Sequence, residues 1–592
     1  MIRNKHCGSG IRWTLCFGLV LTAFLIYSVV KDNNSHTYKS IDPNETLEDL
    51  RYAVIIDAGS SGSRVFIYVW PPHTGNPKEL LNIFPLKDHD GNPSMKKIEP
   101  GLSSSVGKSA GAATDYIAPL LDFAVDIIPK KHHKETPLYI LATAGMRLLN
   151  SSLQASILDD LRTNIPKRYS FSFTENSAEV ISGTQEGIYQ WISMNYILGR
   201  FDHKSDAPLV MVDIDKQSSE SPVIFRKQTV GIMDMGGASM QIAFEITSKV
   251  QYDMLHERSK ENIAEFNLGC LEHGAEHMYR TYVTTYLGLG ANEALEYYND
   301  YLISSAMKNI SNGQVRKNVL FRVHDPCRPL DYVQRINRTV PISGSNETTA
   351  DTYIIFHLKG TGNFDKCRET LRLVLTNLTG CPGSACVLNQ LPIDFSNSQF
   401  YGFSEFWYSM EDVLRIGGKY HFYTFQKEAK AFCTTRWPSL EKRYRSGLYP
   451  LADLHRFQTQ CFKSSWLTVV LHEGLGFSKD YLQLQSSPNT IGGKVAHWTL
   501  GAALYRTRFF PLGDIQRETK SRFGKSTYPV YMVHLNYLFV PCFMLVVGAI
   551  IIYLRRLHCL HPNHVVNLRT FSHSKADDPD LGLLIDRNSY SR

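Results

Sequence analysis

Residues 55–64 read IIDAGSSGSR, an apolar run that ends in Asp57 and opens into a turn of glycines and serines. Small residues in a turn after a strand let several backbone N–H groups point into one concavity, which suits a phosphate group. A Walker loop would need a Gly-Lys pair whose lysine reaches the β and γ phosphates, whereas Arg64 follows the serines here. Asp57 therefore indicates that a metal cation balances the phosphate charge.

Residues 232–241, IMDMGGASMQ, repeat this pattern of a strand, an aspartate, one residue, and then small residues before a second strand. VFIYVW follows the first turn and MQIAFE follows the second, so each unit is expected to be a β-hairpin. A single turn of this kind is usually only an Asx turn, but two with matched flanks predict an internal duplication. We expect an α/β fold of two lobes whose turns face each other across a cleft and hold a polyphosphate. Asp57 and Asp234 would hold a hard divalent cation there.

Two further segments belong to the candidate site. Residues 138–149, LYILATAGMRLL, read as a buried strand that ends near Thr143, with an ordinary strand-to-helix turn as the alternative. Residues 177–199 read as a helix or a helix pair that carries Glu179 and Glu186 among mostly uncharged residues. A helix glutamate usually faces solvent, yet a carboxylate beside a metal-bound polyphosphate is suited to accept a proton from an attacking water.

Two apolar runs frame the chain. Residues 13–30, WTLCFGLVLTAFLIYSVV, follow basic residues and predict a signal anchor, with a cleaved signal peptide as the alternative. Residues 535–554 form a second predicted span and are closed by two arginines. The positive-inside rule makes residues 1–12 and 555–592 cytoplasmic, and it makes residues 31–536 lumenal or extracellular.

Glycosylation signals and cysteines agree with an oxidising compartment. Acceptor sequons begin at Asn33, Asn44, Asn150, Asn309, Asn337, Asn346 and Asn377, all between the two apolar runs. An odd number of cysteines lies there: Cys270, Cys327, Cys367, Cys381, Cys386, Cys433 and Cys461. Cys381 and Cys386 are close enough for a small loop, and the sequence leaves the other pairings open. Zinc binding is the rival use, although this segment has no C-x-x-C pair. The formal charge of +7 indicates no nucleic-acid partner.

Five motifs carry a resemblance to a known family. The chain contains, in order, IIDAGSSGSR, ATAGMR, the EVISGTQEGIYQWISMNYILG stretch, DMGGASMQIAFE and HWTLGAALY. They look like the five apyrase conserved regions of the ecto-nucleoside triphosphate diphosphohydrolase (GDA1/CD39) family. KHHKETPLYI, FNLGC, FYGFSEFWY and QCFKSSW, with the two apolar ends, make the chain most similar to the intracellular Golgi and lysosomal branch. The family fold implies two RNase H-like lobes of the actin and Hsp70 type, lobe I at about 50–180 plus 490–515 and lobe II at about 181–489.

The resemblance implies hydrolysis of the terminal phosphate of nucleoside di- and triphosphates, UDP, GDP and CDP among them, by in-line attack of water with Mg2+ or Ca2+ bound. It gives Glu186 the role of general base and places the two aspartates on the metal through waters. It also implies that Thr143, Gln241 and Trp498 orient the attacking water or the metal waters. The phosphate-binding residues that it implies are Ser60, Ser61, Gly62 and Ser63 from the first lobe and Gly236, Gly237, Ala238 and Ser239 from the second.

Base recognition departs from the cell-surface members of the family. Tyr408 matches one of their two base-stacking tyrosines, but Gln460 stands at the second position. The basic residue that they carry after a Cys-Tyr-Gly step is also absent, because residues 286–292 read YLGLGAN. The disulfides that the resemblance implies are Cys327–Cys367, Cys381–Cys386 and Cys433–Cys461, which leaves Cys270 outside a bridge.

Three alternatives stay open for the function. His273, Glu276 and His277 form H-x-x-E-H, a zinc-protease pattern, although Gly274 weakens the helix that it needs and no third ligand is evident. A nucleotide-binding glycoprotein without turnover is the second, which the presence of Glu186 and both aspartates disfavours. A kinase of the same superfamily is the third, and it would need a second substrate pocket.

The C-terminal residues indicate a cellular address. Asp580, Leu583 and Leu584 fit D-x-x-L-L, and Asp580, Leu584 and Ile585 fit [DE]-x-x-x-L-[LI], two patterns that cytoplasmic sorting adaptors bind. A disordered acidic tail is the alternative. With the family resemblance, these patterns predict a two-span protein of Golgi, lysosomal or endosomal membranes. The alternative location is the plasma membrane, where the chain would act on extracellular nucleotides.

Overall fold

The computed structural model describes residues 50–73, 79–105, 111–202, 209–212, 224–248, 252, 253, 255, 257–270, 275–308, 320–340, 352–379, 391, 398–488, 490, 491, 494–510, 545 and 547–555. The chain divides into two compact units, Met1–Gln516 and Arg517–Arg592. All elements named below belong to the first unit.

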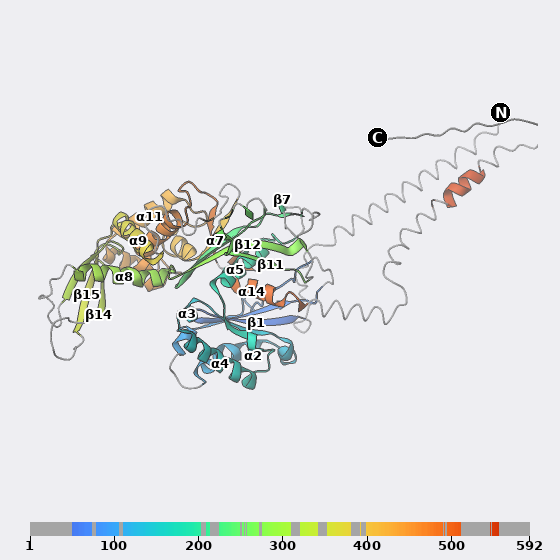
Figure 1. Cartoon of the computed structure of the whole chain (residues 1–592), viewed down its shortest axis with the longest axis horizontal. Coiled ribbons are helices and arrows are strands. Elements are labelled where there is room, and N and C mark those ends of the chain that lie inside the picture. Colours follow the sequence, from blue (N-terminus) through green and yellow to red (C-terminus); the bar gives the residue numbers. More distant parts are fainter. Residues whose placement is uncertain are drawn as a thin grey trace, which may run out of the picture. The chain divides into compact units, whose positions relative to one another are not determined.

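The first sheet contains the first predicted hairpin (Figure 1). Its strand order is β3-β2-β1-β5-β6, with β4 also paired to β2. β1 and β2 are antiparallel, whereas β5 is parallel to β1 and β6 is parallel to β5. The bounds are β1 (Arg51–Ala58), β2 (Ser63–Trp70), β3 (Phe84–Pro85), β4 (Met95–Ile98), β5 (Leu138–Ala142) and β6 (Ala178–Val180).

The near-continuous apolar sequence of β1 reflects burial on both faces of the sheet. Val54 and Ile56 pack into a core that includes Ile117 of α2 and Leu161 of α4. Their neighbour Ile55 points to the other side and packs with residues of α5 and α14. The helices and 3-10 turns of this part are η1 (Leu102–Ser105), α2 (Ala112–Ile127), η2 (Lys130–Glu135), α3 (Ala144–Arg147), α4 (Ser151–Arg168), η3 (Glu175–Ser177) and α5 (Gly183–Ile197).

The second sheet repeats the arrangement of the first around the second hairpin. Its order is β11-β12-β10-β9-β16-β17, in which β9 and β10 are antiparallel, β16 is parallel to β9 and β17 is parallel to β16. The predicted duplication and the two-lobed α/β fold are therefore confirmed, and we name the parts built on these sheets the first and second lobes. The bounds are β9 (Gly231–Met235), β10 (Ser239–Glu245), β11 (Ile263–Asn267), β12 (Met278–Leu287), β16 (Phe400–Ser404) and β17 (Leu484–Ser486).

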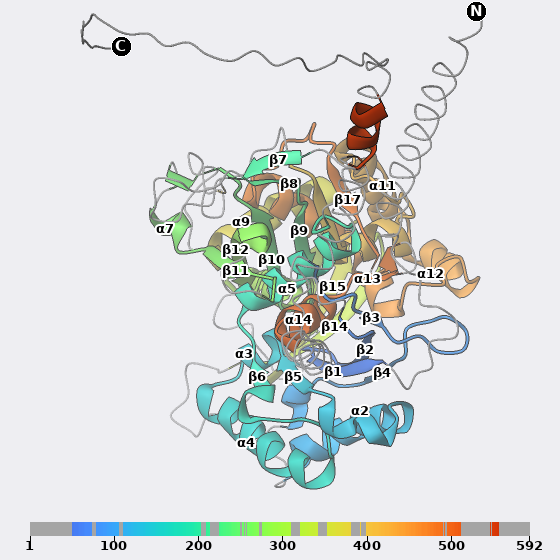
Figure 2. The same cartoon turned by 90° about the vertical axis from the view of Figure 1, so that its right-hand side faces the viewer.

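Two helices lie between the sheets (Figure 2). α14 (Trp498–Thr507) packs against α5 and against β1, although it comes from the far end of the unit. A Cβ on Gly501 would overlap the carbonyl oxygen of Tyr189, so the two helices cross at a distance that only glycine permits. Tyr68 of β2 and Thr499 share a buried hydrogen bond of 2.7 Å. The last predicted motif is thus fixed beside the first.

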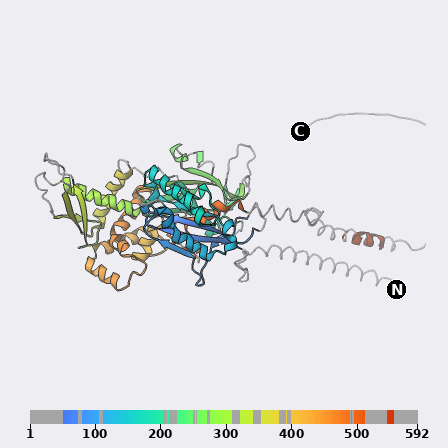
Figure 3. The ribbon, with the colours of Figure 1, turned by 90° about the horizontal axis from the view of Figure 1, so that it is seen from below.

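The second lobe carries a third sheet and a group of helices (Figure 3). The third sheet has the order β13-β15-β14, and in Figures 1 and 3 it lies at the opposite end of the unit from β1. The remaining bounds are β7 (Leu209–Val212), β8 (Ile224–Lys227), α7 (Glu257–Lys260), η4 (Ala275–His277), α8 (Ala291–Lys308), β13 (Leu320–Asp325), β14 (Val333–Val340), β15 (Thr352–Gly360), α9 (Phe364–Thr379), α10 (Glu405–Trp407), the π-helical η5 (Tyr408–Val413), α11 (Phe422–Thr434), α12 (Trp437–Arg445), α13 (Leu454–Val469), the π-helical η6 (Val470–Gly474), β18 (Thr490–Ile491) and β19 (Lys494–Val495).

One expected element is corrected by the structure. The helix predicted from residue 177 begins only at Gly183, because Ala178–Val180 form β6 at the edge of the first sheet. Ser182 caps the helix by accepting a hydrogen bond from the amide of Gln185, and the Gln185 side chain bonds back to the Ser182 amide. Glu179 therefore lies on a strand, where its carboxylate pairs with Arg506.

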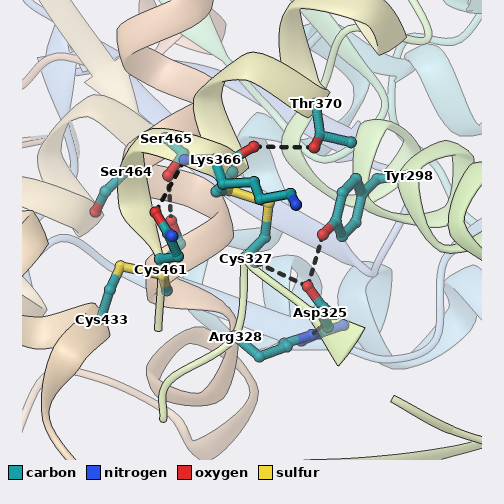
Figure 4. Close-up of a disulfide and its surroundings, with 12 residues drawn as sticks. Tyr298, Asp325, Cys327, Arg328, Lys366, Thr370, Cys433, Cys461, Ser464 and Ser465 are labelled. Atoms are coloured by element: carbon teal, nitrogen blue, oxygen red, sulfur yellow. Dashed lines mark hydrogen bonds and ion pairs between the residues drawn. A yellow bond between two sulfur atoms is a disulfide. The ribbon is translucent and has the colours of Figure 1, made fainter. Parts of the chain in front are cut away.

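Two of the three implied disulfides are present in the structure. Cys327 is bonded to Cys367 and Cys433 to Cys461 (Figure 4). The third implied pair, Cys381–Cys386, lies outside the described residues. Cys270 is a buried thiol that takes part in neither bridge, and burial raises its pKa.

Only some of the sequons and a small part of the predicted spans lie among the residues that the structure describes. Asn150, Asn337 and Asn377 are exposed, as acceptors must be, while the other acceptors (Asn33, Asn44, Asn309 and Asn346) lie outside the described residues. The run 13–30 and most of the run 535–554 also lie outside them, as does the tail motif at Asp580, Leu583, Leu584 and Ile585. Where the structure is described, it contains no helix that is both long enough and apolar enough to cross a membrane.

Candidate functional site

The two predicted phosphate turns face each other. The first turn, residues 59–62, joins β1 to β2, and the second, residues 236–238, joins β9 to β10. A Cβ on Gly237 would lie 3.4 Å from the Ser60 hydroxyl oxygen and 2.9 Å from the Asn292 side-chain nitrogen. Glycine at this position thus lets the second turn approach both the first turn and α8. The duplication brings together two small-residue turns, as the sequence predicted.

The start of α8 holds the second turn in place. The backbone amides of Ala291 and Asn292 donate to the carbonyl oxygens of Gly236 and Gly237, each at 2.9 Å. These amides belong to the first turn of the helix, where they have no partner within the helix itself. The second turn is therefore held by a helix end as well as by its own hydrogen bond from the Gly236 amide to the Ser239 carbonyl at 3.0 Å.

An aspartate lies at the end of the first strand of each hairpin. Asp57 is the penultimate residue of β1, with 5% of its surface exposed, and its Oδ2 lies 3.8 Å from Arg64 Nη1 and 3.6 Å from His497 Nε2. Burial raises the pKa of Asp57 to about 6, with the nearby Arg64 opposing the shift and Asp234 adding to it. Burial and Arg64 lower the pKa of His497 to about 3, so this imidazole is neutral.

Asp234 occupies the equivalent position on β9. Burial raises its pKa, while a hydrogen bond from the Ser404 hydroxyl opposes the rise. Its Oδ1 is buried and has no hydrogen-bond partner among the described residues. An unpaired buried carboxylate oxygen that faces a second carboxylate is costly without a cation.

The donor set fits a hard divalent cation that keeps several of its waters. Two aspartates supply oxygen ligands, which Mg2+ and Ca2+ prefer, and Mg2+ in particular is commonly held by one or two carboxylates and waters beside phosphates. Among the residues that the structure describes, no group of three or more His, Cys, Asp and Glu side chains is arranged to ligate a metal. A cation held largely through waters is consistent with both observations.

Glu186 projects from the first turn of α5. Its Oε2 accepts hydrogen bonds from Arg147 Nη2 at 2.8 Å and from Gln241 Nε2 at 3.1 Å. Burial raises the pKa of Glu186 to about 7, with Arg147 opposing the shift and Asp234 and Asp57 adding to it. A carboxylate whose pKa lies near neutrality is suited to accept a proton from water at physiological pH.

Arg147 joins the two lobes at this site. Besides the Glu186 carboxylate, it donates to the Ser239 hydroxyl at 3.2 Å and to the Ile181 carbonyl at 3.0 Å. Gln241 also donates to the Ser239 hydroxyl, at 2.9 Å. The sequence singled out Ser239, Gln241 and Glu186 and assigned ATAGMR to the site, but it gave Arg147 no role, because the contact of Arg147 with Ser239 depends on how the lobes pack.

The other two residues predicted to orient water lie in different surroundings. Thr143 is buried, and its amide donates to the carbonyl of Ala58 at 3.1 Å, which attaches it to the end of β1. Trp498 is buried in the core and stacks on Tyr189 with ring centroids 6.4 Å apart. Its neighbour His497 is the residue that contacts Asp57. The roles of Thr143 and Trp498 in orienting water stay predictions.

The predicted base-stacking residue lies next to a cation. The guanidinium of Arg456 lies 3.8 Å from the ring centroid of Tyr408, and its Nη1 is 3.1 Å from Asp412 Oδ2. Gln460 is buried and donates to the Ser464 hydroxyl at 2.7 Å, so its side chain is occupied inside the protein. Arg456 therefore covers one face of the ring on which a base is predicted to stack.

A strained serine and a buried ion pair precede Tyr408. Ser404 has φ 54° and ψ −112°, a conformation that residues with a side chain rarely adopt, and its hydroxyl bonds to Asp234. The next residue, Glu405, is buried and pairs with Lys463 at 2.8 Å. Neither feature could be predicted from the sequence, because a positive φ at a serine leaves no pattern and Glu405 and Lys463 lie 58 positions apart.

The zinc-protease pattern does not form the helix that it requires. Glu276 and His277 belong to the short 3-10 turn Ala275–His277, which leads directly into β12, and His273 lies outside the described residues. A pair of histidines four residues apart needs an α-helix to share a face. The structure gives this alternative no support.

Comparison with known proteins agrees with these features. The model of the GDA1/CD39 (nucleoside phosphatase) family matches residues 44–523. Human ectonucleoside triphosphate diphosphohydrolase 4 is 44% identical over 519 residues, which cover 87% of this chain and 82% of that protein. The nucleoside-diphosphatase mig-23 of Caenorhabditis elegans is 35% identical over 517 residues, 86% of each chain.

A solved structure is also similar. The nucleoside triphosphate hydrolase structure from Neospora caninum aligns with a TM-score of 0.47 and 15% identity, covering 78% of this chain and 93% of that one. The family assignment rests on the sequence matches, which extend over most of the described part of the chain and include both hairpins. The chain belongs to the GDA1/CD39 (nucleoside phosphatase) family.

Proposed function

We propose that this protein hydrolyses the terminal phosphate of nucleoside di- and triphosphates, with water as the nucleophile. The observation that carries the proposal is Glu186, a largely buried carboxylate with a pKa of about 7 whose Oε2 is held by Arg147 and Gln241. Relatives named as nucleoside triphosphate diphosphohydrolases and nucleoside-diphosphatases support the substrate class. The repeated sheets support RNase H-like lobes with the substrate between them.

In this proposal each part of the site has a distinct task. The serines and backbone amides of the two turns would bind the phosphates. Asp57 and Asp234 would hold Mg2+ or Ca2+, which would neutralise phosphate charge. Glu186 accepts a proton from the attacking water, while Arg147 and Gln241 fix the position of its carboxylate. No covalent intermediate is required, because in-line attack depends on positioning and on charge stabilisation.

A phosphate-release assay tests the reaction and the metal together. We expect the purified full chain to release phosphate from UDP, GDP and CDP and from the triphosphates when Mg2+ or Ca2+ is present, and to lose this activity in EDTA. The same cations should raise the melting temperature above pH 7, because they offset the repulsion among the buried carboxylates. Nucleotide binding without phosphate release would identify a non-catalytic protein, and full activity in EDTA would overturn the metal assignment.

We further propose that residues 31–536 face the lumen of Golgi or endolysosomal membranes, with spans at 13–30 and 535–554. The exposed acceptor Asn150 supports a glycosylated segment, since its amide oxygen caps α4 by accepting from Leu153 at 3.0 Å and leaves the amide nitrogen for a glycan. Removal of product nucleotide in such a lumen would relieve inhibition of glycosyl transfer.

Glycan mapping and surface labelling test this location. Peptide N-glycosidase should lower the apparent mass of the full chain, and Asn377→Gln should lower it by one glycan. Alanine at Leu583, Leu584 and Ile585 should shift the protein to the plasma membrane, because adaptors would no longer bind the tail. An unglycosylated protein would refute the lumenal assignment, whereas an unchanged internal location of the alanine variant would refute only the sorting motif. Strong surface labelling of the wild-type chain would favour the plasma-membrane alternative.

A further inference from the structure

The outer face of the third sheet presents a row of basic side chains. Arg322 on β13 and Arg335 on β14 lie directly opposite His357 on the central strand β15. In the next row, His324 lies opposite Lys359. Side chains of directly paired residues point to the same side of a sheet. We name these five residues the cationic face.

The cationic face is turned toward solvent because the opposite side of the sheet is its core side. Ile354, Phe356 and Leu358 alternate with the basic residues along β15 and are fully buried with Ile303 of α8. Four members of the cationic face are exposed, and His357 is half-buried. The side chains of the cationic face are therefore available to a partner.

Few acidic side chains accompany the basic ones. Arg322 and Arg335 lie on the two outer strands, on either side of His357. Lys359 has one acidic neighbour, Asp331 at 3.6 Å, and that carboxylate also pairs with Arg436 at 3.1 Å. By contrast Arg338, on the other side of β14, pairs with Asp300 at 2.7 Å. Neither Arg322 nor Arg335 has an ion pair among the described residues.

We propose that the cationic face binds a sulfated glycan chain. Neighbouring strands are roughly 5 Å apart and alternate residues roughly 7 Å apart, so Arg322, Arg335 and Lys359 present charges at short intervals that suit a polymer with repeated sulfates. Guanidinium groups also bind tetrahedral oxyanions in a bidentate manner. The inference rests on the proposed lumenal or extracellular placement, because sulfated glycans occur on that side of the membrane.

Anionic lipid headgroups are the competing partner, and the fold disfavours them. The third sheet lies at the opposite end of the unit from β1, where the described residues of this unit begin at Leu50 (Figures 1 and 3). The described residue that follows the predicted first span in sequence, Leu50, therefore lies far from the cationic face. The exposed acceptor Asn337 lies in the adjacent row of the same face, opposite Ile355, so an N-glycan there borders the face.

Binding to immobilised heparin tests the proposal with the full chain in detergent, before and after removal of N-glycans. We expect the wild-type protein to bind, and the triple variant Arg322→Ser, Arg335→Ser and Lys359→Ser to bind at least tenfold more weakly. The slope of log Kd against log salt should fall by about two to three, because each lost contact releases one counterion fewer. The matched control removes the same charge from the exposed face of α12 with Lys442→Ser, Arg443→Ser and Arg445→Ser.

The control and the activity assay separate the possible outcomes. The α12 variant should keep the wild-type affinity, and both variants should keep wild-type nucleotide hydrolysis, so that failure of the proposed function and failure of this inference are distinguishable. If both triple variants lose heparin affinity equally, the loss depends on net charge alone, and the proposal is overturned. Binding to phosphatidylserine vesicles without binding to heparin would overturn it in favour of a membrane partner.

Discussion

Replacement of Glu186 with glutamine is expected to lower kcat by about 100- to 10,000-fold, the usual contribution of a general base. Glutamine keeps the shape of the side chain and can still accept from Arg147 and Gln241, which hold Glu186 Oε2 at 2.8 and 3.1 Å. Nucleotide affinity, measured by calorimetry with Ca2+ present, should change little. Equal losses of affinity and rate would instead indicate that Glu186 binds substrate or supports the structure.

The same variant should change how stability depends on pH. The folded pKa of Glu186, about 7, lies above its ordinary value of 4.5, so the folded state holds a proton that the unfolded state has lost. Stability of the metal-free protein therefore falls as the pH rises from 4.5 to 7, by roughly 3 kcal/mol from this group. Glutamine does not ionise. The melting temperature of Glu186→Gln should therefore equal that of the wild type at pH 4.5 and exceed it at pH 8.

A cation gives the matching control for this pH effect. Mg2+ or Ca2+ should raise the melting temperature of the wild type more at pH 8 than at pH 4.5, because burial raises the pKa of Asp57 to about 6 and also raises the pKa of Asp234, so the carboxylates that would hold the cation are more fully ionised at the higher pH. A wild-type protein whose stability rises between pH 4.5 and 8 relative to the variant would contradict the assigned pKa of Glu186.

The sequence predicted the parts of this fold that depend on local pattern. Two D-x-G turns with apolar flanks predicted two equivalent hairpins, and both sheets are built around them. The start of α5 was predicted wrongly, because a three-residue strand such as Ala178–Val180 is too short to show an alternating pattern. The pairing of that strand with β5, rather than its own residues, decides its conformation.

The residues proposed for the candidate site could be chosen from motifs, but their contacts could not be predicted. Asp57, Asp234 and Glu186 stand in recognisable motifs, whereas the partners that tune them come from distant segments. Arg147 precedes Glu186 by 39 positions, and Arg456 follows Tyr408 on a different helix. Such contacts depend on how the lobes pack, and a single sequence carries no signal for them.

Support for the second turn extends to a buried network on the far side of α8. Asp325 is fully buried and accepts from the Tyr298 hydroxyl at 2.6 Å and from the Cys327 amide at 2.8 Å (Figure 4). Its other oxygen lies 3.3 Å from Nε of the buried Arg328. Tyr298 belongs to α8, whose first amides hold the second turn. The network thus links the Cys327–Cys367 bridge to the helix that holds the second turn.

Replacement of Asp325 with alanine is expected to cost about 3 to 5 kcal/mol of stability, because it leaves the Arg328 charge buried without its partner and removes the acceptor of two buried donors. Asp331→Ala is the matched control, since Asp331 is partly exposed and also pairs with an arginine, Arg436 at 3.1 Å. A surface pair of that kind contributes up to about 1 kcal/mol. Denaturant unfolding of both variants under non-reducing conditions measures the difference.

If the two substitutions lower the free energy of unfolding equally, the buried network does not stabilise the second lobe, and the position of α8 must depend on its apolar contacts alone. If Asp325→Ala costs more stability than Asp331→Ala, the Asp325→Ala variant should also lose nucleotide affinity at a lower denaturant concentration than the Asp331→Ala variant does. The reason is that the helix that holds the second turn loses its anchor before the first lobe unfolds.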